Sequence, residues 1–105
     1  MSSHVVTVVS ATVGEDRCDA LVDGFNALLQ TGLPDGLLRT ELLHGPDDRW
    51  RIQSVWRDRA ALDAMRAGPQ EPAAPALFRR VGAEPALEIW QLVADSTASA
   101  GPGPS

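Results

Sequence analysis

The feature that most constrains the fold is a change of periodicity within residues 49–65, RWRIQSVWRDRAALDAM. As far as Trp56, residue types alternate with a period of two, which predicts a strand with one apolar face. Beyond it, Asp58 can cap a helix, and apolar residues recur at helical spacing as far as Met65. The segment therefore predicts a strand that runs into a short helix, with Trp56 at the junction, where the mouth of a pocket often forms.

The rest of the chain alternates between the same two kinds of element. A turn composition, Gly-Pro-Asp-Asp, separates the strand ending at His44 from the one beginning at Arg49 and predicts a β-hairpin. Apolar residues spaced i, i+3, i+4 and i+7 from Cys18 to Leu29 predict an amphipathic helix. The order β-α-β-β-α-β, with a short extra helix before the last strand, predicts an α+β fold of the ferredoxin-like type with an antiparallel sheet. The expected strands are residues 5–13, 37–44, 49–56 and 85–94, and the expected helices are residues 18–29, 61–65 and 76–81.

The first strand also predicts an assembly. Residues 5–13, VVTVVSATV, are β-branched and apolar on both faces of the expected strand. A strand with two apolar faces is normally covered on both sides. Helices cover only one face of a ferredoxin-like sheet, so a second copy of the chain is the simplest cover for the other face. The sequence therefore predicts a homodimer paired through its sheets.

Composition limits the remaining possibilities. The 105 residues suit one domain, which we place at residues 1–94, followed by a low-complexity tail at 95–105 that is expected to be disordered. The net charge is −5 without a basic block, which argues against nucleic acid and anionic membranes as partners. No apolar run is long enough to span a membrane, and no signal peptide is evident, so a cytoplasmic location is expected. All nine basic residues are arginine, which indicates a GC-rich bacterial genome.

Most motifs that carry chemistry are absent from the sequence. Cys18 is the single cysteine, expected to be a buried and inert thiol, and His4 and His44 are expected to be surface or strand-end residues. We therefore expect no metal site. No glycine-rich phosphate loop, nucleophile elbow, or local signature of flavin or nicotinamide binding is present. The sequence predicts no cofactor.

An apolar pocket remains as the candidate site. Such pockets bind flat apolar ligands, with a few polar groups that fix their orientation. The residues expected to bind substrate are Trp56, Met65, Phe78, Phe25 and Arg39. The aromatic residues and Met65 are alternatively plain core, and Arg39, like Arg57 and Arg59, is alternatively a solvated surface group. The proline-rich segment 68–75, GPQEPAAP, is either a lid beside this pocket or a simple connector.

The segment SVWRDRAALDAM and the closing strand ALEIWQLVA resemble those of the antibiotic biosynthesis monooxygenase family, over roughly residues 4–94. The resemblance implies a ferredoxin-like domain that pairs into a dimeric α+β barrel. It also implies that Trp56 occupies the family's aromatic position in the site. Many members carry histidine nine residues after that aromatic, where this chain has Met65. Chemistry that needs an imidazole at this position is therefore in doubt.

The resemblance implies three kinds of activity. Some members oxygenate polycyclic phenols to quinones with O2 and without metal or flavin. Others degrade haem with an asparagine on the first strand, a tryptophan and an axial histidine in the second helical region. In this chain the first strand holds no asparagine, the helix offers Met65, and the segment around Phe78 holds no histidine. A third group has no established reaction. We therefore expect a cofactor-independent monooxygenase that acts on an aromatic, polyketide-like small molecule, and the alternative is a non-catalytic small-molecule-binding or accessory dimer.

Overall fold

A computed structural model of the chain describes residues 4–95, and the expected tail lies almost entirely outside this part. Four strands and three α-helices follow one another in the predicted order, and a short 3-10 turn, η1 (Glu15–Arg17), precedes the first helix. Within residues 4–95, no helix has both the length and the apolar character needed to cross a membrane. The elements are β1 (Val5–Thr12), α1 (Cys18–Gln30), β2 (Leu37–His44), β3 (Arg49–Trp56), α2 (Arg59–Ala67), α3 (Ala73–Arg80) and β4 (Ala86–Gln91).

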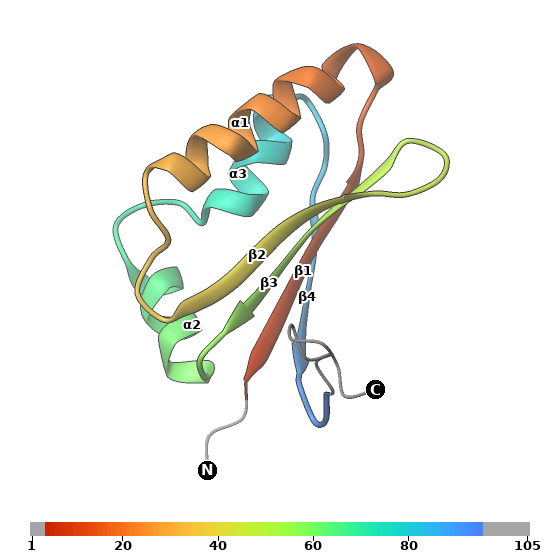
Figure 1. Cartoon of the computed structure of the whole chain (residues 1–105). Coiled ribbons are helices and arrows are strands. Elements are labelled where there is room, and N and C mark those ends of the chain that lie inside the picture. Colours follow the sequence, from red (N-terminus) through yellow and green to blue (C-terminus); the bar gives the residue numbers. More distant parts are fainter. Residues whose placement is uncertain (1–3, 96–105) are drawn as a thin grey trace, which may run out of the picture.

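The strands form one antiparallel sheet in the order β2-β3-β1-β4. The three helices lie on one face of this sheet, and the opposite face is uncovered (Figure 1). This arrangement confirms the predicted ferredoxin-like α+β fold. Strands β1 and β3 lie side by side in the centre of the sheet, and β2 and β4 form its edges.

The alternation along β3 is confirmed residue by residue. Its burial alternates strictly, and the buried side chains are Trp50, Ile52, Ser54 and Trp56. The hairpin before β3 closes through Asp47 and Asp48, which both have positive φ, and the Arg49 N–H donates to the Pro46 carbonyl at 3.2 Å. A turn with two such central residues matches the right-handed twist of the flanking strands.

The core lies between the sheet and the helices in two clusters. The larger one is formed where α1 and α3 cross the sheet, and Phe25 and Phe78 are part of it. The smaller one lies under α2 and joins Trp56 to Val5, Ala61 and Leu62. The predicted apolar face of α1 is thus confirmed at Leu21 and Phe25, whereas Cys18 in its first turn is only partly buried and Leu29 in its last turn is 40% exposed.

The start of α3 differs from the prediction. The sequence predicts that the proline-rich loop extends to residue 75 and that the helix begins at residue 76. In the structure α3 already begins at Ala73, with Pro72 at its N-cap and Pro75 inside its first turn. Proline is tolerated there because the first N–H groups of a helix have no intrahelical acceptor in any case. The last strand is also shorter than expected and ends at Gln91.

Candidate functional site

Trp56 lies where β3 passes into α2, as the sequence predicts. The Asp58 side chain accepts a hydrogen bond from the Ala61 N–H at 2.8 Å, which caps α2 directly after the strand. The Trp56 ring is 4% exposed, and its indole Nε1 donates to Thr7 Oγ1 on β1 at 3.1 Å. Strand pairing places Thr7 beside Ser54, two residues before Trp56 on β3. The tryptophan is therefore held in one orientation by both packing and a hydrogen bond.

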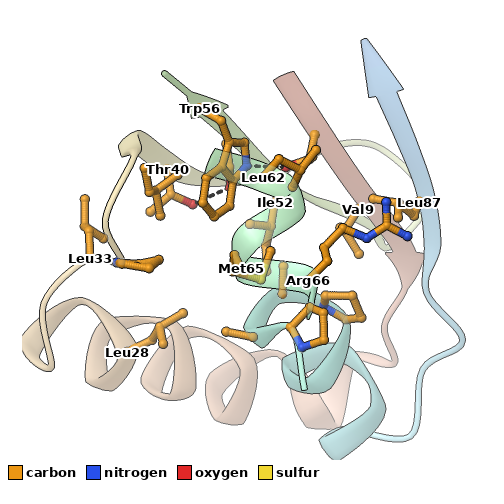
Figure 2. Close-up of a pocket in the computed structure, with 18 of the residues that line it drawn as sticks. Val9, Leu28, Leu33, Thr40, Ile52, Trp56, Leu62, Met65, Arg66 and Leu87 are labelled. Carbon is orange, nitrogen blue, oxygen red and sulfur yellow. Dashed lines mark hydrogen bonds between the residues drawn. The ribbon is translucent and has the colours of Figure 1, made fainter. Parts of the chain in front are cut away.

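A pocket of about 180 Å³ opens beside Trp56, between the sheet and the helices (Figure 2). All four strands contribute residues to its floor, and Leu62, Met65 and Arg66 of α2 form one wall. The loop at Leu33 and the proline-rich start of α3 form the other sides. An apolar cavity of about 150 Å³ accommodates benzene. The enclosed space therefore suits about one or two rings, and a larger ligand would extend through the opening.

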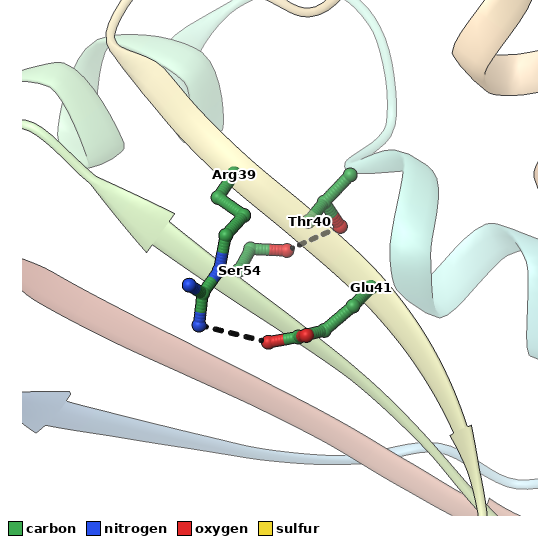
Figure 3. A network of polar contacts seen from close by, with 4 residues as sticks. All are labelled: Arg39, Thr40, Glu41 and Ser54. Carbon is green, nitrogen blue, oxygen red and sulfur yellow. Dashed lines mark hydrogen bonds and ion pairs between the residues drawn. The ribbon is translucent and has the colours of Figure 1, made fainter. Parts of the chain in front are cut away.

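Three hydroxyl groups interrupt this apolar lining. Thr7, Ser54 and Thr40 all line the pocket, and Thr7 and Ser54 are buried. Thr40 Oγ1 and Ser54 Oγ are 2.9 Å apart and share one hydrogen bond (Figure 3). These hydroxyls give the floor a polar strip that can orient a ligand.

Arg66 is the one ionisable group among the described residues that line the pocket. Its side chain extends from α2 toward Leu87 of β4 (Figure 2). Within residues 4–95 it forms no hydrogen bond or ion pair, so its guanidinium is available to an anionic group of a ligand. No carboxylate or imidazole from this part of the chain lines the pocket, and arginine stays protonated. The described lining therefore offers no side chain that could act as a general base.

The five residues predicted from the sequence to bind substrate do not lie together in the structure. Trp56 and Met65 line the pocket together. Phe25 and Phe78 lie in the larger core cluster, 6% and 0% exposed, and do not line it. Arg39 projects away from the helices on β2, where its Nη2 donates to Glu41 Oε1 at 3.2 Å (Figure 3).

The two histidines lie outside this pocket. His4 Nδ1 is 3.0 Å from the Arg57 carbonyl oxygen. His44 stacks on Trp50 at the far end of the sheet, with ring centroids 4.1 Å apart and an interplanar angle of 9°. Among residues 4–95, no cluster of three or more His, Cys, Asp or Glu side chains has an arrangement that could hold a metal ion.

Sequence reasoning missed the hydroxyls, Arg66 and the loop around Leu33. Ser54 carried a signal, because a hydroxyl between Trp50 and Trp56 on a buried strand face must find a polar partner. The loop around Leu33 has no such signal in the sequence, since its approach to α2 depends on the packing of the whole helical layer. The proline-rich segment forms part of the pocket wall from Pro72 to Pro75.

Comparisons with solved structures agree with the fold. A haem-degrading protein from Mycobacterium tuberculosis superposes with a TM-score of 0.70 at 20% identity, covering 92% of this chain and 99% of that one. SnoaB, a cofactor-independent oxygenase from Streptomyces nogalater, superposes with a TM-score of 0.64 at 19% identity, covering 91% and 97%. A putative antibiotic biosynthesis monooxygenase from Caulobacter crescentus gives 0.70 at 15% identity, covering 89% and 92%.

Sequence comparison identifies the family. No curated protein is significantly similar to the chain in sequence. The sequence profile described as "Antibiotic biosynthesis monooxygenase" matches residues 4–74, which is well over half of the chain. This match covers β1, α1, the hairpin and α2, and so includes the junction at Trp56. The chain belongs to the antibiotic biosynthesis monooxygenase family.

Proposed function

We propose that the chain is a cofactor-independent monooxygenase that oxidises a small aromatic, polyketide-like phenol with O2 in the pocket beside Trp56. The observation that carries the proposal is the pocket itself, which is apolar, partly enclosed and lined by Trp56 and Met65, with hydroxyls on its floor. Family membership supports the proposal. So does the shared fold with SnoaB, a cofactor-independent oxygenase.

In this reaction the substrate supplies the electrons. For an anthrone, water removes a proton, and the resulting anion transfers one electron to O2. The two radicals then join in a C–O bond, and the peroxide takes up a proton. Loss of the remaining C–H proton breaks the O–O bond, which leaves a quinone carbonyl and releases the second oxygen atom as water. The protein contributes a dry, shaped pocket, positioning, and donors that stabilise the anion.

The proposed assembly is a homodimer that pairs through the uncovered face of the sheet. By the alternation along the strands, Val6 and Val8 of β1 point to this face, and Val6 is paired with Trp90 of β4. Trp90 is 58% exposed in the single chain, which is unusual for a large aromatic side chain. A second copy that covers this face would bury it.

The alternative function is non-catalytic binding of a similar small molecule. It is favoured by one observation, namely that no carboxylate or imidazole from the described residues lines the pocket. The two functions share the ligand class and differ in whether the ligand is consumed.

Anthrone oxidation in buffer that contains 18O2 tests the proposal. If the chain is a monooxygenase, one O2 should be consumed per quinone formed, and the quinone should contain one labelled oxygen atom. It also predicts a rate proportional to protein concentration and unaffected by chelators. Binding of anthrone without any acceleration over the protein-free rate would favour the non-catalytic alternative.

A further inference from the structure

Three hydroxyl side chains lie in a single line across the floor of the pocket, and we call them the hydroxyl row. The row consists of Thr40 on β2, Ser54 on β3 and Thr7 on β1. In the strand ladders Ser54 is the direct partner of Thr40 on one side and of Thr7 on the other. Direct partners in an antiparallel ladder point to the same face with Cβ atoms about 5 Å apart. All three line the pocket, in the middle of otherwise apolar walls.

The hydrogen bonds of the row leave two donors unused. A hydroxyl carries one hydrogen and can accept two. Thr7 Oγ1 accepts from the Trp56 indole, so its own hydrogen must be directed elsewhere. Thr40 and Ser54 have two hydrogens between them, and only one can lie in their mutual hydrogen bond. Within residues 4–95, no further hydrogen bond from these three hydroxyls is present.

The two unused donors determine which functional group a ligand needs at this position, namely a hydrogen-bond acceptor. A buried donor without an acceptor is unfavourable, and an apolar ligand edge placed against the row would leave both donors unsatisfied. A carbonyl or phenolate oxygen has enough lone pairs to accept from both. The Trp56–Thr7 hydrogen bond also fixes which lone pair of Thr7 is occupied, so the remaining donor has a preferred direction.

We propose that the hydroxyl row binds one oxygen of the ligand, a carbonyl, phenol or phenolate oxygen at the edge of a flat apolar ring system, and thereby sets which edge faces the sheet. This inference rests on the proposed ligand-binding function of the pocket. Hydrogen bonds to a charged acceptor are stronger than those to a neutral one, so the row favours the phenolate over the phenol. The row therefore makes the bound ligand more acidic, in a pocket where no carboxylate or imidazole from the described residues can act as base.

Two ligands of nearly equal shape test the proposal: 2-naphthol, and 2-methylnaphthalene, in which a methyl group replaces the hydroxyl. Calorimetry gives the affinity of the full chain for each. The wild type is expected to prefer 2-naphthol by roughly tenfold or more, the value of about one hydrogen bond. The absorbance of bound 2-naphthol should show its pKa lowered by about one unit, because hydrogen bonds to the anion are the stronger ones.

The variants exploit the internal hydrogen bond of the row. In Thr40→Val alone, the Ser54 hydroxyl, which lies next to Thr7, keeps its hydrogen for the ligand, so this variant should keep most of the preference. The double variant Thr40→Val/Ser54→Ala removes this donor and leaves only Thr7, so it should lose part of the preference for 2-naphthol while still binding 2-methylnaphthalene. Ser10→Ala, which removes a hydroxyl from β1 outside this pocket, is the matched control and should change nothing.

The possible outcomes distinguish the role of the hydroxyl row from the ligand-binding function of the pocket. If the wild type binds both ligands equally, or the double variant keeps the full preference, the hydroxyl row has no such role and the pocket proposal stands. If the wild type binds neither ligand, the proposed pocket function fails and the row with it. If the double variant does not fold, the preference and the lowered pKa in the wild type still decide the matter, since their absence overturns the proposal.

Discussion

Replacing Gly36 with alanine should destabilise the chain at the point where the loop beside the pocket meets α2. Gly36 has φ +86°, and its carbonyl oxygen accepts the Arg57 N–H at 2.8 Å, so the loop is tied to the residues that lead into the helix. A Cβ on Gly36 would lie 2.4 Å from the Ala61 Cβ, whereas ordinary contacts of this kind begin near 3.4 Å. The clash is with a rigid helix and cannot be relieved by a side-chain rotation.

Two contributions to the free energy of unfolding add at this position. A left-handed backbone costs a residue with a side chain about 1–2 kcal/mol. Forcing an extra carbon into a filled space costs about 1–3 kcal/mol more. We therefore expect Gly36→Ala to lose about 2–5 kcal/mol. Gly32→Ala is the matched control, because Gly32 has φ +90° with no atom within 4 Å of an added Cβ, and it should lose only the first 1–2 kcal/mol.

Urea denaturation followed by tryptophan fluorescence measures both variants, since the chain has three tryptophans and no tyrosine. All samples need the same protein concentration, because dimerisation would make stability depend on it. Equal losses in Gly36→Ala and Gly32→Ala would refute the argument, since they would mean that the contact with Ala61 imposes no cost.

Four further predictions follow from the packing. Phe25→Ala should cost about 3–5 kcal/mol in denaturation, and a loss below about 1 kcal/mol would show that Phe25 is not core. Asp48→Gly should stabilise by about 0.5–1 kcal/mol, seen as a higher melting temperature, because glycine relieves the positive φ in the hairpin turn, and a lower melting temperature would contradict this. Trp56→Phe should lower the free energy of unfolding by about 1–2 kcal/mol more than Trp50→Phe does. The reason is that Trp56 loses its hydrogen bond to Thr7, whereas the buried Trp50 Nε1 has no partner within residues 4–95. Equal losses in denaturation would argue against the Trp56–Thr7 hydrogen bond. If the chain forms the proposed dimer, Trp90→Glu should convert it into monomers in sedimentation equilibrium, and an unchanged dimer mass would contradict an interface at Trp90.

The fold could be predicted because its signals are local. The alternation along residues 49–56 and the cap at Asp58 are properties of neighbouring residues, and each was sufficient to define its element. The start of α3 differs from the expected residue 76 because prolines disfavour a helix interior but are compatible with a first turn, where they remove no intrahelical hydrogen bond.

The candidate site was less predictable because its lining comes from segments far apart in the sequence. Phe25 and Phe78 are apolar residues on helix faces, as Met65 is, but the rotation of each helix on the sheet directs the two phenylalanines into the core and Met65 to the pocket. That rotation is a result of tertiary packing. Trp56 could be located because a strand-to-helix junction is visible in the sequence itself.

Oxygen uptake with anthrone, compared among the wild type, Trp56→Phe and Trp50→Phe, tests the central claim most directly. Both tryptophans are buried on the same face of β3, and only Trp56 lines the pocket beside α2. The account predicts uptake by the wild type without added metal or flavin, a large loss in Trp56→Phe, and little change in Trp50→Phe. Equal rates in all three folded proteins, or no uptake above the protein-free rate, would contradict an oxygenase site at Trp56.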